Sequence, residues 1–386
     1  MNRVIYADYN ATTPVDPSIR EAMRPAFEDL FGNPSSSHWL GVKAKMAVAQ
    51  ARSRTAALLG CAPIEFYFTS GGSESNNWAI KGAAWALRGR GNHLVTSAVE
   101  HAAVLNPCRF LESFGFETTV VPVDGRGRVD PDDVARAIRP GTVLVSIMHA
   151  NNEVGTIQPV GKIARICRQR DVLFHVDAAQ SVGKIPVNVA EIGCDLLSVA
   201  GHKFHAPKGV GGLFIREGVT IEALVHGAGH ERGRRAGTEN VAGALALARA
   251  ADLAGERLAA YGPRMAGLRR RFIDALSSAV RDVVIYPVDS GADVLPNTVN
   301  LRIARIDGAL LAERMEGVAV SAGGAACHGS ARAPSHVLTA MGVPADEALG
   351  AVRFSFGWEN TEDEIDDLAE RIVRAVESID SQPVSA

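Results

Sequence analysis

Short β-rich runs alternate with helical patterns over residues 64 to 215, and this alternation limits the chain to few folds. The β-rich runs are IEFYFTS, HLVTS, FETTVVPV, TVLVSIMH, VLFHVD, CDLLSVA and GGLFIR. Strands that alternate with helices are typical of α/β domains, in which helices cover a mostly parallel sheet. The pattern therefore predicts an α/β domain with a mostly parallel sheet.

The pattern changes towards the carboxyl terminus. Residues 238 to 277 form one helical stretch rich in Ala, Leu and Arg, which we expect YGP at 261 to 263 to break, because proline ends or kinks helices. Beyond it, the short strands VVIYPV, TVNLRI, VAVSAG and AVRFSF are interleaved with helical segments. We therefore expect a large α/β domain over residues 16–262. Residues 1–15 and 263–386 would form a smaller α+β domain.

Composition excludes several classes of partner. The chain has 386 residues, of which 47% are hydrophobic and 22% charged, and its net charge is −3. Proteins that bind nucleic acid or membrane surfaces usually carry a clustered basic excess, and none is seen here. No uncharged apolar run approaches the roughly 18 residues of a membrane span. The start, MNRVIYADYN, does not resemble a signal peptide, so we expect a cytoplasmic protein.

The cysteines are five in number, widely spaced and without a CxxC pair. This pattern indicates neither a disulfide framework nor a zinc site, and we predict no metal. We expect Cys61, Cys108, Cys167 and Cys194 to fill core or surface positions. Cys327 differs, because it lies among small residues in SAGGAACHGSARAPSHVL, with no apolar periodicity around it. We interpret this stretch as a loop that carries a thiol.

One of the seven lysines follows the end of a predicted strand. Ligands of open α/β sheets bind beyond the carboxyl ends of strands. Lys203 follows LLSVA there, between His202 and His205, where restricted solvation would make its amine a nucleophile and base. A lysine on a surface loop is the alternative. The other lysines are Lys43, Lys45, Lys81, Lys162, Lys184 and Lys208, and we expect most of them to be solvated.

Other strand ends carry further polar residues. FTSGGSESNN joins a strand to a helix start, where backbone N–H groups and the Ser73 hydroxyl would bind a phosphate; a simple helix cap is the alternative. Asp177, after FHV, is suited to a protonated ring nitrogen or to capping a helix. His101 and Asn152 follow two more strands, and each alone is commonly just a satisfied polar residue.

Together these features describe a pyridoxal phosphate (PLP) site. A phosphate site, an imidazole that can stack on a ring, an aspartate for a ring nitrogen and a lysine are the groups that this cofactor requires. The chain has no HExxH motif, and its glycine-rich segments match neither GxGxxG nor GxxxxGK[ST]. The sequence therefore favours PLP over a catalytic metal or a nucleotide.

The chain also resembles a known family over residues 6 to about 378. The matching segments are ADYNATTPVDP, FGNPSSSH, TSGGSESNN, EHAAV, NNEVGTIQP, HVDAAQSVGK, GHKFHAPKGVG, GHERGRRAGTEN and VRFSFG. They are similar to the NifS/IscS group of cysteine desulfurases, which are class V, fold-type I PLP enzymes. The resemblance implies a large domain with a sheet of the seven-stranded, mostly parallel type and a smaller α+β domain.

The resemblance also implies an activity and partners. Such an enzyme is a homodimer that converts L-cysteine to L-alanine and holds the sulfur as a persulfide on a loop cysteine. The sulfur then passes to an acceptor protein, such as an iron–sulfur scaffold. No direct nucleic-acid or membrane partner is implied.

The catalytic residues follow from the matching motifs. Lys203 resembles the lysine that binds the cofactor covalently, and His101 the histidine that stacks on its ring. Asp177 would pair with the ring nitrogen, and Gln180 would bind the phenolic oxygen. Cys327 aligns with the cysteine that receives the sulfur.

The remaining matches concern the phosphate and the substrate. Gly72, Ser73 and His202 match phosphate-binding positions, and Thr238 matches a phosphate ligand from the other subunit. Asn152, also a cofactor contact, and Arg353 match the residues that receive the substrate carboxylate, a task suited to the guanidinium fork.

Two departures from the family pattern keep alternatives open. Ala200 stands where the family has a serine that binds phosphate, and GAACHGS is similar to a string in selenocysteine lyases. His328 would lower the thiol pKa of Cys327 if the two side chains meet. A selenocysteine lyase, another PLP lyase that does not use Cys327, and a non-catalytic homologue that binds partners remain as alternatives.

Overall fold

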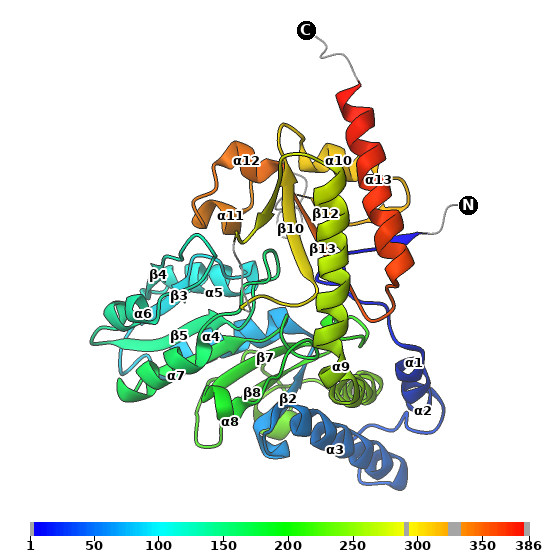
Figure 1. Cartoon of the computed structure of the whole chain (residues 1–386). Coiled ribbons are helices and arrows are strands. Elements are labelled where there is room, and N and C mark those ends of the chain that lie inside the picture. Colours follow the sequence, from blue (N-terminus) through cyan, green and yellow to red (C-terminus); the bar gives the residue numbers. More distant parts are fainter. Residues whose placement is uncertain (1–3, 289–292, 323–332, 382–386) are drawn as a thin grey trace.

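A seven-stranded sheet forms the centre of the larger part of the molecule (Figure 1). The computed structural model describes residues 4–288, 293–322 and 333–381. In spatial order the strands are β2 (Phe66–Thr69), β8 (Gly211–Ile215), β7 (Leu196–Ala200), β6 (Leu173–Asp177), β5 (Thr142–Met148), β3 (His93–Ser97) and β4 (Glu117–Val121). Only β8 runs antiparallel to its neighbours in this sheet. The predicted α/β fold with a mostly parallel sheet is therefore confirmed.

Helices cover both faces of this sheet. One face carries α4 (Gly72–Ala86) and α5 (Ala102–Glu112), and the other carries α6 (Pro131–Ala137), α7 (Val160–Gln169), α8 (Val189–Ile192) and part of α9 (Val241–Ala279). Adjacent residues of one strand serve different faces: Leu196 packs with the first set and Leu197 with the second. Because both faces are covered, the central strands are apolar on both sides, as is typical of parallel sheets.

Further helices lie around this core. They are α1 (Pro17–Met23), α2 (Pro25–Glu28), α3 (Trp39–Leu59) and the 3-10 turns η1 (Pro63–Glu65), η2 (Gly201–Lys203) and η3 (Glu231–Gly233). Helix α3 packs against α9 and ends at Gly60, whose φ of 69° lies in the left-handed region that glycine adopts easily.

A second, smaller sheet forms the upper part of the molecule in Figure 1. Its order is β12 (Ser321–Ala322), β13 (Ala351–Ser355), β10 (Thr298–Ile303) and β9 (Val283–Tyr286), all antiparallel. The other elements here are α10 (Gly308–Arg314), α11 (His336–Ala340), α12 (Ala345–Leu349) and α13 (Glu362–Asp380), with β1 (Ile5–Tyr6) paired to β11 (Val318–Ala319). The segment VAVSAG thus forms two strands in two sheets, where the sequence predicted one.

Helix α9 corrects a second expectation. It runs without interruption from Val241 to Ala279, although Pro263 lies inside it, so the predicted break at 261 to 263 is wrong. Tyr261, Met265 and Leu268 are buried in the core of the smaller part, and this packing offsets the hydrogen bond that proline removes. The helix connects both parts of the molecule (Figure 1). A boundary at 262/263 would therefore lie within one helix, and the domain division stays a prediction.

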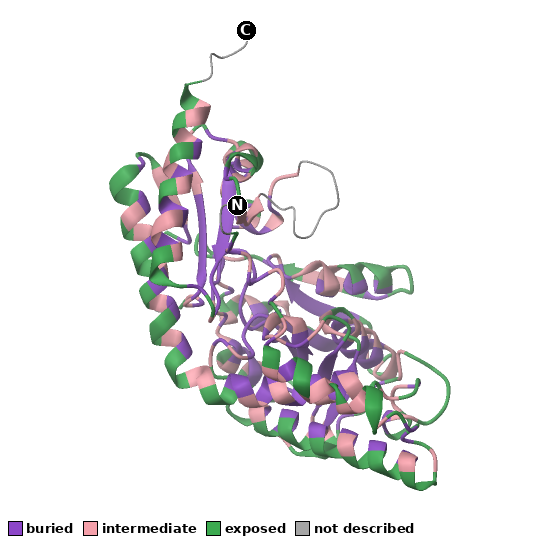
Figure 2. Ribbon diagram, turned by 90° about the vertical axis from the view of Figure 1, so that its right-hand side faces the viewer, coloured by how far each residue is buried: buried purple, intermediate pink, exposed green. Residues whose placement is uncertain are grey.

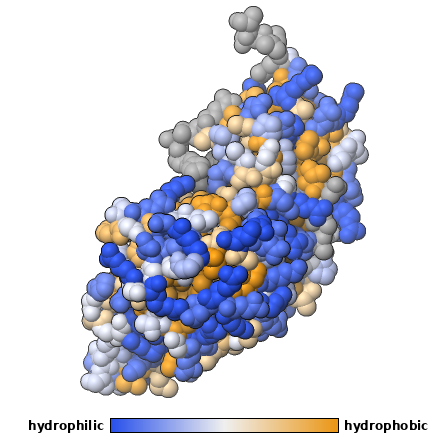
Figure 3. Space-filling view, turned by 90° about the vertical axis from the view of Figure 1, so that its left-hand side faces the viewer, coloured by the Kyte–Doolittle hydropathy of each residue, from blue (hydrophilic) through white to orange (hydrophobic). Residues whose placement is uncertain are grey.

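Burial follows this architecture. In Figure 2 the strands are buried and the outer faces of the helices exposed. In Figure 3 the hydrophobic residues that reach the surface gather mainly where the larger and smaller parts meet. Among the described residues, no helix has both the length and the apolar character needed to cross a membrane.

We predict that Phe272→Ala destabilises the smaller part strongly. The Phe272 ring is fully buried, and its centroid lies 4.9 Å from that of Phe354 and 5.5 Å from that of Phe356. Truncating such a side chain leaves a cavity and should cost about 3–5 kcal/mol of unfolding free energy. Urea unfolding measures this loss. Val120→Ala, at a half-exposed position of the edge strand β4, is the control and should cost about 0.5 kcal/mol or less.

Candidate active site

One large cavity lies between the two parts of the molecule, at the carboxyl ends of the parallel strands. Its volume is about 760 Å³, enough for a cofactor together with a small substrate. Of the residues predicted for the site, its lining includes Gly72, Ser73, His101, Asn152, Asp177, Gln180, His202, Lys203 and Arg353. These residues come from six separate segments of sequence, so the fold brings together what the sequence distributed along the chain.

Asp177 ends β6 and is nearly buried. Its Oδ2 accepts a hydrogen bond from Asn76 Nδ2 at 2.7 Å, and its Oδ1 accepts one from the backbone N–H of Ala179 at 2.9 Å. Two donors from different elements therefore fix the orientation of the carboxylate. Asn76 Oδ1 is buried with no hydrogen-bond partner among the described residues.

Lys203 ends the turn η2, directly after β7. Its Nζ donates to the backbone carbonyl oxygens of Asn10 and Ala11, both at 2.7 Å. Neutral carbonyl groups from the N-terminal segment thus hold the amine beside the cavity.

His101 caps the start of α5. Its Nδ1 accepts the backbone N–H of Ala103 at 3.0 Å, so the proton of the neutral ring lies on Nε2. Burial lowers the pKa of His101, and the nearby Lys203 charge lowers it further, while Asp177 opposes both. The ring is therefore neutral at pH 7 and able to accept or donate a proton at the cavity edge.

The start of α4 is suited to bind an anion. Gly71 precedes the helix with no side-chain cap, so the first N–H groups of α4 are open to a ligand. A Cβ at Gly72 would lie 3.1 Å from the Ala200 methyl, so this wall is tightly packed where the family has a serine. The acid in the first turn, Glu74, is bound by Arg235 through two hydrogen bonds of 2.8 and 3.1 Å. It is thereby kept from repelling an anion.

His202 adds a second neutral imidazole to this surface. Burial lowers its pKa to about 4, with the charges of Lys203 and Lys208 contributing. Its Nδ1 lies 3.1 Å from Thr12 Oγ1. A neutral ring here can donate one hydrogen bond to an anion, and it brings no charge of its own.

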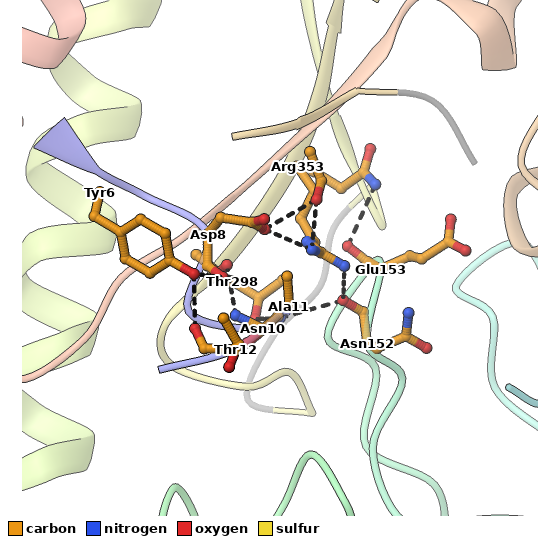
Figure 4. Close-up of polar contacts among 12 residues, drawn as sticks. Tyr6, Asp8, Asn10, Ala11, Thr12, Asn152, Glu153, Thr298 and Arg353 are labelled. Carbon is orange, nitrogen blue, oxygen red and sulfur yellow. Dashed lines mark hydrogen bonds and ion pairs between the residues drawn. The ribbon is translucent and has the colours of Figure 1, made fainter. Parts of the chain in front are cut away.

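Arg353, on β13, is bound to an acid from the other end of the chain (Figure 4). Its Nη2 donates to Asp8 Oδ1 at 2.6 Å and to Ser321 Oγ at 2.8 Å, and its Nη1 donates to the carbonyl oxygen of Asn152 at 3.0 Å. Its Nε is buried without a partner among the described residues. A carboxylate ligand at this arginine would therefore share the guanidinium with Asp8.

The remaining predicted residues do not line the cavity or lie outside the described residues. Thr238 is exposed and is not among the described residues that line the cavity. Cys327 and His328 lie outside the described residues. Cys61, Cys108, Cys167 and Cys194 are free, and burial raises the pKa of each to about 12, which makes their thiols unreactive at pH 7. Their predicted role as filling residues is confirmed.

Sequence reasoning missed four residues of the site. Asp8, Asn10 and Asn76 line the cavity, and Lys184 lies behind it. Lys184 is an exception to the expectation that most of the other lysines are solvated, because it is only 3% exposed. All four lie in the segments ADYNATTP, TSGGSESNN and HVDAAQSVGK, which already carried the family resemblance; their place within these motifs was the available signal.

Comparison with known proteins agrees with this geometry. The model of the family "Aminotransferase class-V" matches residues 5–368. The chain belongs to this family. It is 47% identical over 384 residues to "Cysteine desulfurase IscS" of Dictyoglomus turgidum, covering 98% of this chain and 97% of the relative. A second IscS, from Methanosarcina thermophila, is 44% identical over 98% of this chain and 93% of its own length.

Solved structures show the same fold. A structure named "NifS-like protein" superposes with a TM-score of 0.91 at 39% identity, covering 97% of this chain and all of the other. One described as SspA in complex with cysteine has a TM-score of 0.82 at 37% identity, covering 91% of this chain and 98% of the other. The predicted resemblance to the NifS/IscS group is therefore confirmed, and the two IscS relatives are named cysteine desulfurases.

We predict that Glu100→Gln changes how stability depends on pH. Glu100 is fully buried beside His101; its Oε1 accepts hydrogen bonds from Ser97 Oγ at 2.6 Å and from Met148 N–H at 2.9 Å. Burial, with the charge of Asp177, raises its pKa from 4.5 to about 8. Between pH 4.5 and about 8, the Glu100 carboxyl is deprotonated in the unfolded chain but still protonated in the folded chain. Its contribution to the free energy of unfolding therefore falls as pH rises towards 8.

The variant should therefore gain thermal stability relative to the wild type as pH increases from about 5 to 8, with no further gain above that range. Melting temperatures measured at several pH values test this. Glu112→Gln, on the exposed side of α5, is the control for losing a glutamate. Parallel curves for wild type and Glu100→Gln would show that Glu100 is ionised in the folded protein.

Proposed function

We propose that this chain is a PLP-dependent cysteine desulfurase that converts L-cysteine to L-alanine and transfers the sulfur to Cys327. The observation that carries the proposal is the single cavity in which Lys203, Asp177, His101 and Arg353 meet. The relatives named cysteine desulfurase support the choice of reaction, and they do not favour the selenocysteine lyase alternative.

The residues of the cavity fit PLP. The open start of α4 with Ser73 and the neutral His202 suit a phosphate, while Asp177 suits a protonated ring nitrogen and Lys203 supplies the amine for covalent attachment. When bound, PLP supplies an electron sink that makes the Cα proton of an amino-acid substrate acidic. Gln180, Asn152 and the exposed Thr238 complete the proposed cofactor contacts, Thr238 from the partner subunit.

The chain's own residues then have separate tasks. Arg353 and Asn152 receive the substrate carboxylate, and the planar guanidinium orients it through paired hydrogen bonds. Lys203 Nζ takes the proton from Cα, and the neutral ring of His101 moves a proton at the edge of the site. Asp177 keeps its carboxylate directed at the ring nitrogen, because Asn76 and Ala179 hold it.

Cys327 takes the sulfur. Its thiolate attacks the substrate sulfur; an S–S bond forms, the Cβ–S bond breaks, and Cβ gains a proton to give L-alanine. The product on the enzyme is a persulfide, which a second thiol, on an acceptor such as an iron–sulfur scaffold protein, can remove. The four described cysteines are unsuited to this step, because burial holds them as thiols.

A homodimer is the proposed assembly. The α2 to α3 region exposes Phe27, Phe31, Trp39 and Met46, each more than half accessible, and such a cluster is typical of a surface that another protein covers. The free thiols of all four described cysteines support the reducing cytoplasm as the proposed compartment.

We predict that Cys327→Ala abolishes turnover of L-cysteine and leaves the cofactor bound. Wild-type protein incubated with L-cysteine and a reductant should release alanine and sulfide in equal amounts, because each persulfide formed leaves one alanine. The variant should release neither, while its visible cofactor absorbance persists. Cys61→Ala is the matched control at a partly exposed free cysteine and should retain activity. Alanine release that survives Cys327→Ala would identify a lyase that does not use this thiol.

We predict that Arg353→Lys weakens binding of the substrate carboxylate. Lysine keeps the charge but loses the planar fork, so KM for L-cysteine should rise by roughly 10- to 100-fold. Steady-state kinetics separate this effect from a change in kcat. Arg371→Lys, an arginine of α13 that pairs with Asp367, is the matched control and should leave KM unchanged. An unchanged KM in Arg353→Lys would place the carboxylate elsewhere in the cavity.

A further inference from the structure

Lys184 is a buried lysine that the proposed reaction does not use. It is 3% exposed, and its Nζ lies 2.7 Å from Asn10 Oδ1 and 2.7 Å from Gln180 Oε1. Both acceptors are neutral amide oxygens, and Lys184 forms no salt bridge within the part of the chain that the structure describes. A buried ammonium without a carboxylate partner is costly, so this environment favours the neutral amine.

The charges around Lys184 act in the same direction. Burial lowers the pKa of Lys184 well below its ordinary value, and the positive charges of Lys203 and Arg353 lower it further. A neutral amine has two N–H groups, and the two amide oxygens accept both of them. The neutral form is therefore fully satisfied as a donor in this position.

These two hydrogen bonds determine how the Gln180 amide is oriented. Lys184 Nζ donates to Gln180 Oε1, so Oε1 points towards Lys184 and Nε2 points away from it. Nε2 in turn donates to the carbonyl oxygen of Asn10 at 2.9 Å, a group that accepts only. The second N–H of Gln180 has no protein partner in the described ranges, and Gln180 lines the cavity.

The same logic orients Asn10. Because Asn10 Oδ1 accepts from Lys184, its Nδ2 is left to donate to Thr298 Oγ1 at 2.8 Å and to the carbonyl oxygen of Asn152 at 3.2 Å (Figure 4). Lys184 thus stabilises the orientation of two amides, together with the carbonyl oxygen of Asn10, which accepts from Gln180 Nε2, and with Asn297 Nδ2, which donates to Asn10 Oδ1.

We propose that Lys184 is a positioning residue that locks the amide of Gln180 with one N–H group directed at the cavity. It acts through Gln180 and touches neither substrate nor cofactor. The inference rests on the proposed function in one respect, since the atom that would accept this N–H is the ring oxygen of PLP. Orientation of the amide itself does not depend on that function.

Hydrogen exchange of the glutamine side chains tests the inference directly. The chain has only five glutamines, so selective 15N labelling of full-length protein gives few side-chain signals. In Lys184→Met, which keeps the length and apolar stem of the side chain, exchange of the Gln180 amide should accelerate by about tenfold or more. Gln158 is an internal control: it is buried, it is bound to Val129 N–H and Gly127 O, and its exchange should not change. Unchanged protection of Gln180 would overturn the proposal.

A double-variant cycle guards against simple loss of folding. In the wild-type background, Lys184→Met leaves Gln180 Oε1 without its hydrogen-bond donor. In a Gln180→Leu background that oxygen is absent, and Asn10 Oδ1 still accepts a hydrogen bond from Asn297 Nδ2 at 3.2 Å. Lys184→Met should therefore lower the melting temperature clearly in the wild type and much less in Gln180→Leu. Equal losses in both backgrounds would mean that Lys184 acts independently of Gln180.

The cofactor provides the last measurement. With PLP bound, a donor near the ring oxygen favours its anion, so Lys184→Met should shift the pH midpoint of the visible absorbance change upward by about 0.5 to 1 unit. The shift should be absent in the Gln180→Leu background. If the wild type gains no visible absorbance with PLP, the proposed function fails, while hydrogen exchange and the stability cycle still decide the role of Lys184.

Discussion

The two parts of the molecule meet at one buried amide, Asn10, and the site depends on it. Its side chain bonds Thr298 from the smaller sheet and Lys184 from the larger part, and its backbone carbonyl accepts from Lys203 and Gln180. Apart from the half-buried Lys203, these groups are withdrawn from water, so a hydrogen bond lost among them would leave an unsatisfied polar atom. The geometry of the cavity therefore follows from how the N-terminal segment lies between the two sheets.

Charge in the cavity is limited by burial. His101, His202 and Lys184 all have pKa values lowered chiefly by burial, so each favours its neutral form as a hydrogen-bonding group. Arg353 forms an ion pair with Asp8, and Asp177 is held by neutral donors. An ionic ligand entering the cavity thus meets a small number of charges whose positions are already fixed, which reduces the cost of reorganising the site.

The sequence predicted the strand ends well, because the rule behind that prediction is local. Asp177 ends a strand of the parallel sheet, His101, Asn152 and Lys203 each follow one, and parallel strands place their carboxyl ends at one edge. Strand and helix patterns between residues 64 and 215 were likewise sufficient to predict the order of elements. The family motifs then assigned a chemical role to each of these residues, which their position at a strand end alone left open.

Contacts that depend on packing between distant segments were not predictable in this way. Asp8 and Arg353 are 345 residues apart, and nothing in either local pattern pairs them. Lys184 belongs to a residue type that is usually exposed, and no periodicity in the sequence reveals that this lysine is buried. The continuity of α9 through Pro263 also depends on burial against the smaller sheet, since the local rule for proline predicts the opposite.

The loop that carries Thr238 is fixed to the same helix start that is suited to bind an anion. Arg235 binds Glu74 in the first turn of α4, and Glu231, nearly buried, forms two hydrogen bonds with Arg52 at 2.6 and 2.7 Å. Thr238 follows three residues after Arg235 and faces outward. In a twofold dimer both subunits contribute the same surface to the interface. If Thr238 of one subunit reaches the phosphate site of its partner, the partner's Thr238 must therefore reach the phosphate site of the first subunit. The ion pair between Glu74 and Arg235 would then set the position of both sites at once.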